Sequence, residues 1–363
     1  MDALTITLSI LGGFVALIAG GELLVRGASN LAAAFKVPPL IIGLTVVAIG
    51  TSAPEMAVSV QSCYVGKTDL AVGNVVGSNL SNLLFILGAA ALVGPLAVSK
   101  QLFRLDIPVM IVAAMLLYAL GMDGSLSRGE GITLAILTVL YLSWTIVEGK
   151  RDAKHLEDEL EDIMPSDEAG KAIGSNLALV AVGLVLLIGG ANYLVDGCVK
   201  LATAWGVSEL VVGLTIVAIG TSLPELVISV LASLRGKRDL AVGNVVGSNI
   251  LNVLAVLGVS AAVAPEGVNV HAQSLRFDIP LMVAVSVACF PIFLSGKQVS
   301  RVEGCGMLLY YLAYLAWLVY SFVVVKQPPG YGSLVGFLVP LAVAMVLLAA
   351  TRRRADGESP PAA

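Results

Sequence analysis

The chain has 363 residues, of which 58% are hydrophobic and only 13% are charged, and its formal net charge is −4. Soluble domains carry roughly a quarter charged residues, so this composition excludes an ordinary soluble protein and indicates a membrane protein. The small net charge and the scattered Lys and Arg give no basis for binding nucleic acid. The apolar runs are long and continuous, which predicts transmembrane helices rather than the alternating strands of a barrel.

Eleven apolar runs are long enough to cross a bilayer as helices. The first run has no basic segment before it and is therefore interpreted as a full span, not as a cleavable signal peptide. In chain order, the spans are expected at residues 4–24, 39–65, 70–94, 105–121, 129–148, 174–195, 208–234, 240–264, 277–295, 303–325 and 333–351. The predicted fold class is an all-α polytopic membrane protein.

The orientation follows from the positive charges of the connecting segments. With the N-terminus outside, 16 of the 21 Lys and Arg residues fall on the inner side and five on the outer side. Cytoplasmic segments carry such an excess of Lys and Arg, so the N-terminus is expected outside and the C-terminus in the cytoplasm.

The sequence repeats itself at an offset of 170 residues. Residues 43–60 match residues 213–230 at 13 of 18 positions, and residues 69–88 match residues 239–258 at 15 of 20. Each unit holds five spans, an odd number, so the second unit should lie upside down relative to the first. The predicted architecture is an inverted repeat of two five-helix units, which form a ten-helix core, plus an eleventh C-terminal helix.

Segments outside the two units complete the domain organisation. The units are expected at 1–148 and 174–325, joined by an acidic cytoplasmic linker at 149–173. The linker lacks the ligand spacing of an EF-hand loop, so a solvated segment is favoured over a regulatory cation site. Residues 333–351 form the extra transmembrane helix and residues 352–363 a cytoplasmic tail.

Both units contain a charged motif inside an apolar run, "GLTVVAIGTSAPE" at 43–55 and "GLTIVAIGTSLPE" at 213–225. Each S-x-P-E segment fits a capping box with proline in the first turn, so a membrane helix should be broken there. The break should leave the carbonyl groups around Ala48 to Gly50 without partners in their own helix. A carboxylate at the bilayer centre costs on the order of 3 kcal/mol, so a cap alone gives no reason to place a glutamate there.

The two glutamates, Glu55 and Glu225, are related by the repeat and should meet near its pseudo-twofold axis at the membrane midplane. The freed carbonyls and the hydroxyl groups of Thr51 and Thr221 would complete an all-oxygen cage around them. Such ligands suit Ca²⁺ and should also suit Na⁺, whereas the nitrogen and sulfur ligands of zinc or copper are absent.

The motif "GNVVGSNLSN" and its copy "GNVVGSNILN" supply further polar groups. Asn74, Ser78 and Asn82 lie on one helical face, and the pattern recurs at Asn244, Ser248 and Asn252. Polar contacts between membrane helices are the simpler explanation of such residues, but for Ser78, Asn82, Ser248 and Asn252 a cation site is favoured. Glycines should let these helices approach the broken ones closely, at positions 73, 77, 243 and 247.

The remaining charges are expected to be structural. Glu22 and Arg26 lie one turn apart near the inner end of the first span, which predicts an interfacial ion pair. Asp106 and Asp278 stand at helix starts, where acidic residues interact favourably with the helix dipole.

The two motif blocks resemble the α-repeats of the calcium/cation antiporter superfamily, specifically its prokaryotic sodium/calcium exchanger branch. The resemblance covers about residues 1–325 and implies alternating access, with calcium exchanged for sodium across the inner membrane, no enzymatic activity and no bound cofactor. It implies that Glu55 and Glu225 are the central calcium ligands. Further ligands for calcium or sodium would be Thr51, Thr221, Ser52, Ser222, Ser78, Ser248 and the carbonyl groups of Ala48 and Ala218.

One position departs from part of that family. Some exchangers carry an aspartate where this chain has Asn252, so the site holds two carboxylates and the coupling ion stays open between sodium and protons. The proton-coupled branch usually shows a G-N-x-x-E motif instead, which favours sodium. A cation channel and an intramembrane aspartyl protease are rival classes, and the G-x-G-D motif of the latter is absent. The sequence does not determine the oligomeric state.

Overall fold

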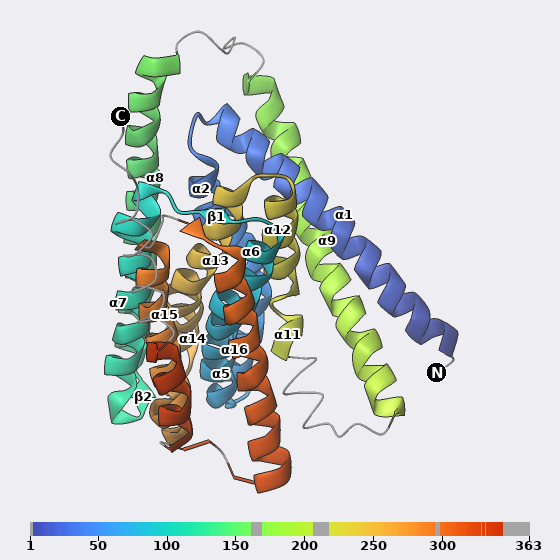
Figure 1. Cartoon of the computed structure of the whole chain (residues 1–363), viewed down its shortest axis with the longest axis vertical. Coiled ribbons are helices and arrows are strands. Elements are labelled where there is room, and N and C mark those ends of the chain that lie inside the picture. The colour runs from blue at the N-terminus through green and yellow to red at the C-terminus, as the bar shows by residue number, and fades with distance from the viewer. Residues whose placement is uncertain are drawn as a thin grey trace, which may run out of the picture.

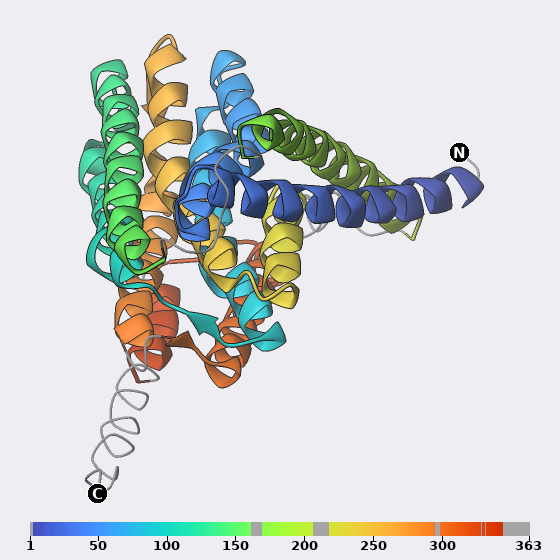
Figure 2. The same cartoon turned by 90° about the horizontal axis from the view of Figure 1, so that it is seen from above.

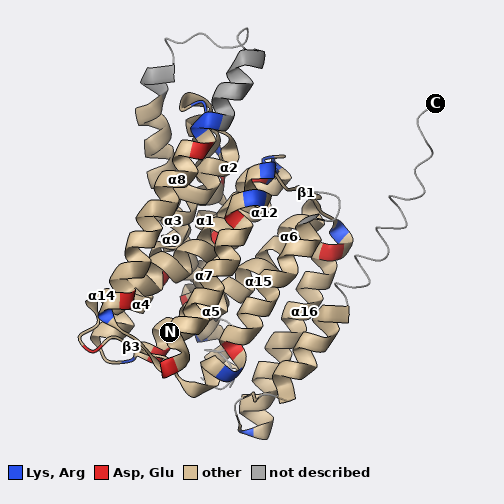
Figure 3. Ribbon diagram, turned by 90° about the vertical axis from the view of Figure 1, so that its left-hand side faces the viewer, with Lys and Arg blue, Asp and Glu red and all other residues tan. Residues whose placement is uncertain are grey.

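The computed structural model describes residues 3–160, 169–205, 218–294, 298–327, 329–330 and 332–343. The described chain forms a bundle of long helices with two short β-ribbons (Figure 1). Helices satisfy their own backbone hydrogen bonds, which a segment in lipid requires. Ribbon segments of charged residues gather mostly at the two ends of the bundle, and only a few acidic ones lie between them (Figure 3). This distribution is that of a membrane protein.

The first half runs from the N-terminus to the end of α8. Its helices and π-helical or 3₁₀ turns are α1 (Ala3–Ala34), α2 (Pro39–Ile42), η1 (Gly43–Val47), α3 (Ala48–Thr51), α4 (Ala53–Tyr64), α5 (Thr68–Leu80), η2 (Ser81–Ile86), α6 (Leu87–Val93), η3 (Leu102–Asp106), α7 (Ile107–Leu120), η4 (Gly121–Asp123) and α8 (Arg128–Leu160). Its strands are β1 (Leu96–Ala97) and β2 (Ser125–Leu126).

The second half repeats this order of elements. Its helices and turns are α9 (Ala169–Ala204), α11 (Ala218–Gly220), α12 (Leu223–Leu234), α13 (Arg238–Leu251), η6 (Asn252–Leu257), α14 (Gly258–Val263), η7 (Ser274–Asp278), α15 (Ile279–Leu294), α16 (Arg301–Tyr320) and η8 (Ser321–Val325). Its strands are β3 (Val268–Asn269) and β4 (Gln298–Val299), and one more apolar helix follows at Gly332–Val343.

Each of the eleven predicted spans overlaps a described helix, two of them only in part. Eight described helices are long and apolar enough to cross a membrane, and the bent pair Pro39–Thr51 and Ala53–Tyr64 forms a ninth candidate. The other two predicted spans correspond to the shorter helices Leu223–Leu234 and Gly332–Val343. Residues 206–217, 344–351 and the predicted tail lie outside the described residues.

The predicted linker is partly helical in the structure. Helix α8 continues to Leu160 and α9 begins at Ala169, so both neighbouring helices extend into the segment expected to be a linker at 149–173. The part between them, 161–168, lies outside the described residues.

Contacts between the halves occur in reciprocal pairs. Strand β1 pairs antiparallel with β4, and β2 pairs antiparallel with β3, although β1 corresponds to β3 in the repeat and β2 to β4. Likewise α6 packs against α16, while its counterpart α14 packs against α8. Two equal units related by a twofold axis produce such exchanged contacts.

The first helices of the two halves, α1 and α9, lie side by side and cross the bundle obliquely (Figures 1 and 2). Gly13 meets the backbone of Gly190, and Gly20 meets that of Gly183, so the two helices run antiparallel. Small residues allow such close approach between membrane helices. Antiparallel packing of equivalent helices is what an inverted repeat requires, and the orientation of the units in a membrane stays a prediction.

Candidate cation site

The first motif breaks its helix where the sequence predicts it. Helix α3 ends at Thr51, α4 begins at Ala53, and the two parts of the span meet at an angle of 43°. Ser52 between them has ψ of 5°, and proline occupies the first turn of α4. The second motif has the same geometry at Ser222, where ψ is 7° and α12 follows.

The predicted capping boxes at these breaks are wrong. Neither Ser52 nor Ser222 makes a side-chain hydrogen bond to the helix that it precedes. The pattern S-x-x-E does form a capping box at α16, where Ser300 N donates to Glu303 Oε2 at 2.7 Å and Glu303 N donates to Ser300 Oγ at 3.3 Å. The same arrangement occurs before α8, between Ser127 and Glu130.

The backbone explains this difference. A capping serine normally has extended backbone geometry, as Ser300 has with ψ of 164°. Ser52 instead also ends the upstream helix, because its N–H donates to Ala48 O at 3.0 Å, and its ψ of 5° is not extended. Its hydroxyl group therefore does not accept the N-capping hydrogen bond from an N–H group in the first turn of α4.

The same hydrogen bond corrects the prediction of freed carbonyl groups. Ala48 O accepts from Ser52 N and also lies 3.4 Å from the Thr51 hydroxyl oxygen, so it is not unpartnered. In the second half, Ser222 N donates to Ile219 O at 3.1 Å, and not to Ala218, the first described residue of α11. The chain bends at the first break but does not unwind there as far as predicted.

Several buried oxygen atoms around the two breaks have no hydrogen-bond partner. Glu55 and Glu225 are each only 1% exposed, and both oxygens of Glu55 are unpartnered. The other such oxygens from predicted site residues are Glu225 Oε2, Ser52 Oγ, Ser222 Oγ, Ser248 Oγ, Asn82 Oδ1 and Asn252 Oδ1. Proteins rarely leave buried polar atoms unpaired, and each costs about 1–3 kcal/mol, so this group of oxygens fits a bound cation.

The two halves meet at the glutamates. Glu55 and Glu225 lie within electrostatic reach of each other, Thr221 lies beside Glu55, and Thr51 lies beside Glu225. The Thr51 hydroxyl also donates to Asn244 Oδ1 at 3.2 Å. The predicted site residues of the two motifs are thus brought together by exchanged contacts, like the strands and helices of the fold.

Two serines that the sequence reasoning missed support the glutamates. Asn74 Nδ2 donates to Ser59 Oγ at 3.0 Å and to the Glu55 backbone oxygen at 3.2 Å, which ties α5 to α4. The same contacts recur at 3.1 and 3.4 Å among Asn244, Ser229 and Glu225. The signal was present in the sequence, because each serine follows its glutamate by one helical turn in both repeats.

The predicted site residues of the second motif lie inside the protein. Ser78, Ser248, Asn82 and Asn252 are all buried. The π-helical turns η2 and η6 lie at the two asparagines, and such turns are frequent at functional sites. Asn252 Nδ2 donates to Asn79 Oδ1 at 3.1 Å, which joins the two motif helices.

Two of the four predicted glycines, both in α13, permit close helix packing. A Cβ atom at Gly243 would lie 2.8 Å from Leu40 O, and one at Gly247 would lie 2.9 Å from Leu44 O, which confirms the predicted close approach for these two. Gly73 and Gly77 have no neighbour of this kind among the described atoms.

The candidate site contains two carboxylates, those of Glu55 and Glu225. Within the described ranges no group of three or more His, Cys, Asp or Glu residues could hold a metal ion. Asp106 lies elsewhere, fully buried at the start of α7, where it accepts a hydrogen bond from Tyr141 Oη at 3.1 Å. The predicted ion pair of Glu22 with Arg26 is wrong, because Glu22 pairs with Arg235 at 2.6 Å across the helix interface.

A polytopic bundle in which two repeated halves each contribute a broken helix and a buried carboxylate has the architecture of a secondary transporter. Comparison with known proteins identifies the class as a calcium/cation antiporter. The chain belongs to the sodium/calcium exchanger protein family, whose model matches residues 5–147 and 175–320.

Relatives match over most of their length. CaxA of Alkalimonas amylolytica is 40% identical over 317 residues, covering 86% of this chain and 98% of the relative. The inner membrane protein YrbG of Escherichia coli is 36% identical, covering 86% and 97%. The solved structure of the sodium-calcium exchanger NCX_Mj superposes with a TM-score of 0.76 at 30% identity, covering 87% of this chain and 100% of that one.

Proposed function

We propose that this protein exchanges calcium for sodium across the membrane by alternating access, with the transported ions bound at Glu55 and Glu225. The observation that carries the proposal is the contrast among four S-x-x-E segments. The glutamates of two segments cap helices, whereas Glu55 and Glu225 are buried, and both oxygens of Glu55 and Oε2 of Glu225 have no hydrogen-bond partner. A buried carboxylate without a partner is costly unless a cation binds it.

Calcium suits this set of oxygens in charge and in ligand type. Two carboxylates balance one divalent ion, and hydroxyl, amide and carbonyl oxygens complete its coordination. We assign the ligand set to the two glutamates and the polar residues around them: Thr51, Thr221, Ser52, Ser222, Ser78, Ser248, Asn82, Asn252 and the carbonyl groups of Ala48 and Ala218. The protein needs no bound cofactor in this scheme and acts as a transporter, not as an enzyme.

Sodium as the counter-ion is supported by similarity. The relative MaX1 of Methanosarcina acetivorans, 31% identical over 346 residues, is named a sodium/calcium exchanger, as NCX_Mj is. The absence of a third carboxylate at Asn252 leaves protons as the alternative coupling ion. We place the protein in the inner membrane of a prokaryotic cell with its N-terminus outside.

The deciding experiment measures calcium-45 uptake into proteoliposomes at fixed pH. Uptake should require an outward sodium gradient, stop when choline replaces sodium, and saturate with calcium. Uptake that persists in choline and follows an imposed pH gradient would make the protein a proton/calcium antiporter. Uptake that needs no counter-ion and does not saturate would indicate a channel.

A further inference from the structure

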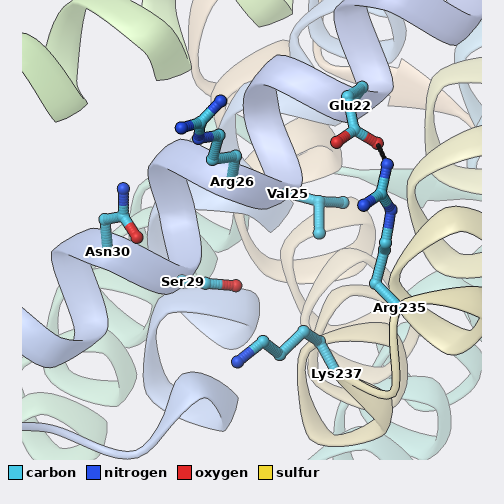
Figure 4. Close-up of a pocket in the computed structure, with 7 residues that line it drawn as sticks. All are labelled: Glu22, Val25, Arg26, Ser29, Asn30, Arg235 and Lys237. Atoms are coloured by element: carbon cyan, nitrogen blue, oxygen red, sulfur yellow. Dashed lines mark ion pairs between the residues drawn. The ribbon is translucent and has the colours of Figure 1, made fainter.

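A second polar cavity lies away from the candidate cation site. It has a volume of about 380 Å³ and opens between the C-terminal part of α1 and the turn that joins α12 to α13 (Figure 4). Its polar lining consists of Glu22, Arg26, Ser29, Asn30, Arg235 and Lys237. None of these residues belongs to the predicted ligand set.

The cavity carries an excess of positive charge. Its lining holds three cationic side chains and one carboxylate, a formal balance of +2 (3 − 1). Glu22 neutralises Arg235 at 2.6 Å, while Arg26 and Lys237 have no acidic partner among the described residues. Ser29 Oγ is buried without a hydrogen-bond partner, so the cavity also offers an unused hydroxyl donor.

The position of the cavity corresponds to the lipid headgroups. Arg26 lies two residues beyond the predicted end of the first span, in the C-terminal part of an apolar helix that continues to Ala34, and Arg235 and Lys237 lie in a turn between two apolar helices. The distribution of Lys and Arg assigns this end of the bundle to the cytoplasmic side. Basic pockets between transmembrane helices on that side suit anionic headgroups.

An apolar surface leads along α1 to the cavity. Phe14 and Ile18 are 56% and 45% exposed, and they precede Glu22 and Arg26 at intervals of four residues on the same helical face. An occupant that reaches from this face into the cavity needs an acyl chain next to an anionic head. A free phosphate ion would use only the polar end.

The repeat does not duplicate these charges. At the offset of 170 residues, the positions of Arg26 and Arg235 are occupied by Asp196 and Val65, and only Lys237 has a basic counterpart, Lys67. Duplication of the transport machinery therefore does not account for the cavity. It is a feature of one membrane face.

We propose that this cavity binds the phosphate group of one anionic phospholipid, with Arg26 and Lys237 as its charged contacts and the acyl chains along Phe14 and Ile18. Arg and Lys bind phosphate through charge-assisted hydrogen bonds, and each cation near an anionic surface contributes measurably to the affinity. The ion pair of Glu22 with Arg235 holds α1 against the α12–α13 turn and so keeps the cavity in shape.

The test measures how many phosphatidylglycerol molecules stay bound to detergent-purified, intact protein by native mass spectrometry. We expect one retained lipid, and we expect Arg26→Gln/Lys237→Gln to weaken its binding by about 30-fold, from two lost cationic contacts. The matched control is Lys67→Gln, which removes the same charge from the equivalent turn of the other half and should leave retention unchanged. Thermal unfolding of each variant shows that it is folded.

A second arm separates lipid from free phosphate. Phosphatidylglycerol should raise the Tm of delipidated protein, whereas phosphatidylcholine or inorganic phosphate should not, and the double variant should lose the shift. Equal retention by the wild-type protein and the double variant would overturn the site. A shift with inorganic phosphate equal to that with phosphatidylglycerol would overturn the assignment to a lipid.

Discussion

At the scale of single residues, one four-residue pattern serves two purposes in this chain. Ser127–Glu130 and Ser300–Glu303 cap helices at the membrane surfaces, and there the serine has partners on both its oxygen and its backbone. Ser52 and Ser222 cannot do so because their backbone also belongs to the preceding helical turn. The glutamates that follow them are consequently not engaged in a capping box.

Removing either charge from the candidate site should stop transport. We expect Glu55→Gln and Glu225→Gln each to lower calcium-45 uptake by about 100-fold or more, since a buried charge contact to a divalent ion is worth several kcal/mol. The matched control is Glu130→Gln, which changes an exposed capping glutamate in the same pattern and should leave uptake within about twofold, because an exposed cap contributes only about 1 kcal/mol to stability. Uptake near the wild-type level in either site variant would refute the assignment.

Asn252 should influence the counter-ion more than calcium. Its amide donates to Asn79 while its oxygen is unpartnered, so Asn252→Asp adds a titratable group to the proposed ligand set. We expect the sodium or pH dependence of uptake to change more than the half-saturating calcium concentration does. Asn82→Asp, at the equivalent position of the first repeat, is the companion variant. A change confined to calcium affinity would contradict this role.

At the scale of elements, glycine decides how closely helices approach. Gly13 packs its backbone against α9, where an added Cβ would lie 2.5 Å from Leu194 N, whereas Gly12 has nothing within 4 Å. The two residues are neighbours on one helix and differ only in the face they occupy. Because glycine has no side chain, the backbones of α1 and α9 can pack in direct contact. In lipid, burial of apolar side chains gives no hydrophobic driving force, so the van der Waals contacts of this close packing stabilise the helix pair instead.

This pair gives a stability test with an internal control. Gly13→Ala should lower the free energy of unfolding by about 1–3 kcal/mol, because the neighbouring backbone cannot move aside without separating the helices. Gly12→Ala should leave it unchanged or raise it by up to about 1 kcal/mol through helix propensity. The measurement is thermal or denaturant unfolding of both variants in one detergent. Equal destabilisation by both would contradict the packing shown for α1 and α9.

At the scale of the whole molecule, the two halves are joined by reciprocal contacts, in which elements of one half pair with elements of the other. The β-ribbons, the contacts of α6 with α16 and of α14 with α8, and the threonines beside the glutamates all cross from one unit to the other. In the proposed ligand set, each half contributes one of the two glutamates. A site shared in this way can open toward one side or the other when the units shift relative to each other.

Reporter fusions test the predicted orientation of the molecule. A fluorescent protein fused after residue 363 should fold and fluoresce, because the excess of Lys and Arg places the C-terminus in the cytoplasm. Alkaline phosphatase fused after Gln327, in a segment expected outside, should be active. Activity of phosphatase at residue 363 and inactivity at Gln327 would reverse the assigned topology.

The sequence alone determined the helical membrane fold, the positions of all eleven apolar segments and the two charged motifs. These features depend on local composition and on the repeat, and a residue in lipid has few alternatives to a helix. The break at Ser52 was predictable for the same reason, because proline and the polar residues around it are local signals. The family resemblance rests on these same motifs, and the match of the family model over both halves confirms it.

Only the tertiary structure decided which partners the polar groups take. Whether Ser52 caps its helix depends on its backbone angle, and whether Glu22 pairs with Arg26 or Arg235 depends on the distance between α1 and a turn some 200 residues away. All four serines share the S-x-x-E pattern that predicts a cap, and only the two non-capping ones have proline two residues later. Long-range packing sets these contacts, because an ion pair or hydrogen bond forms with whichever group lies within about 3 Å.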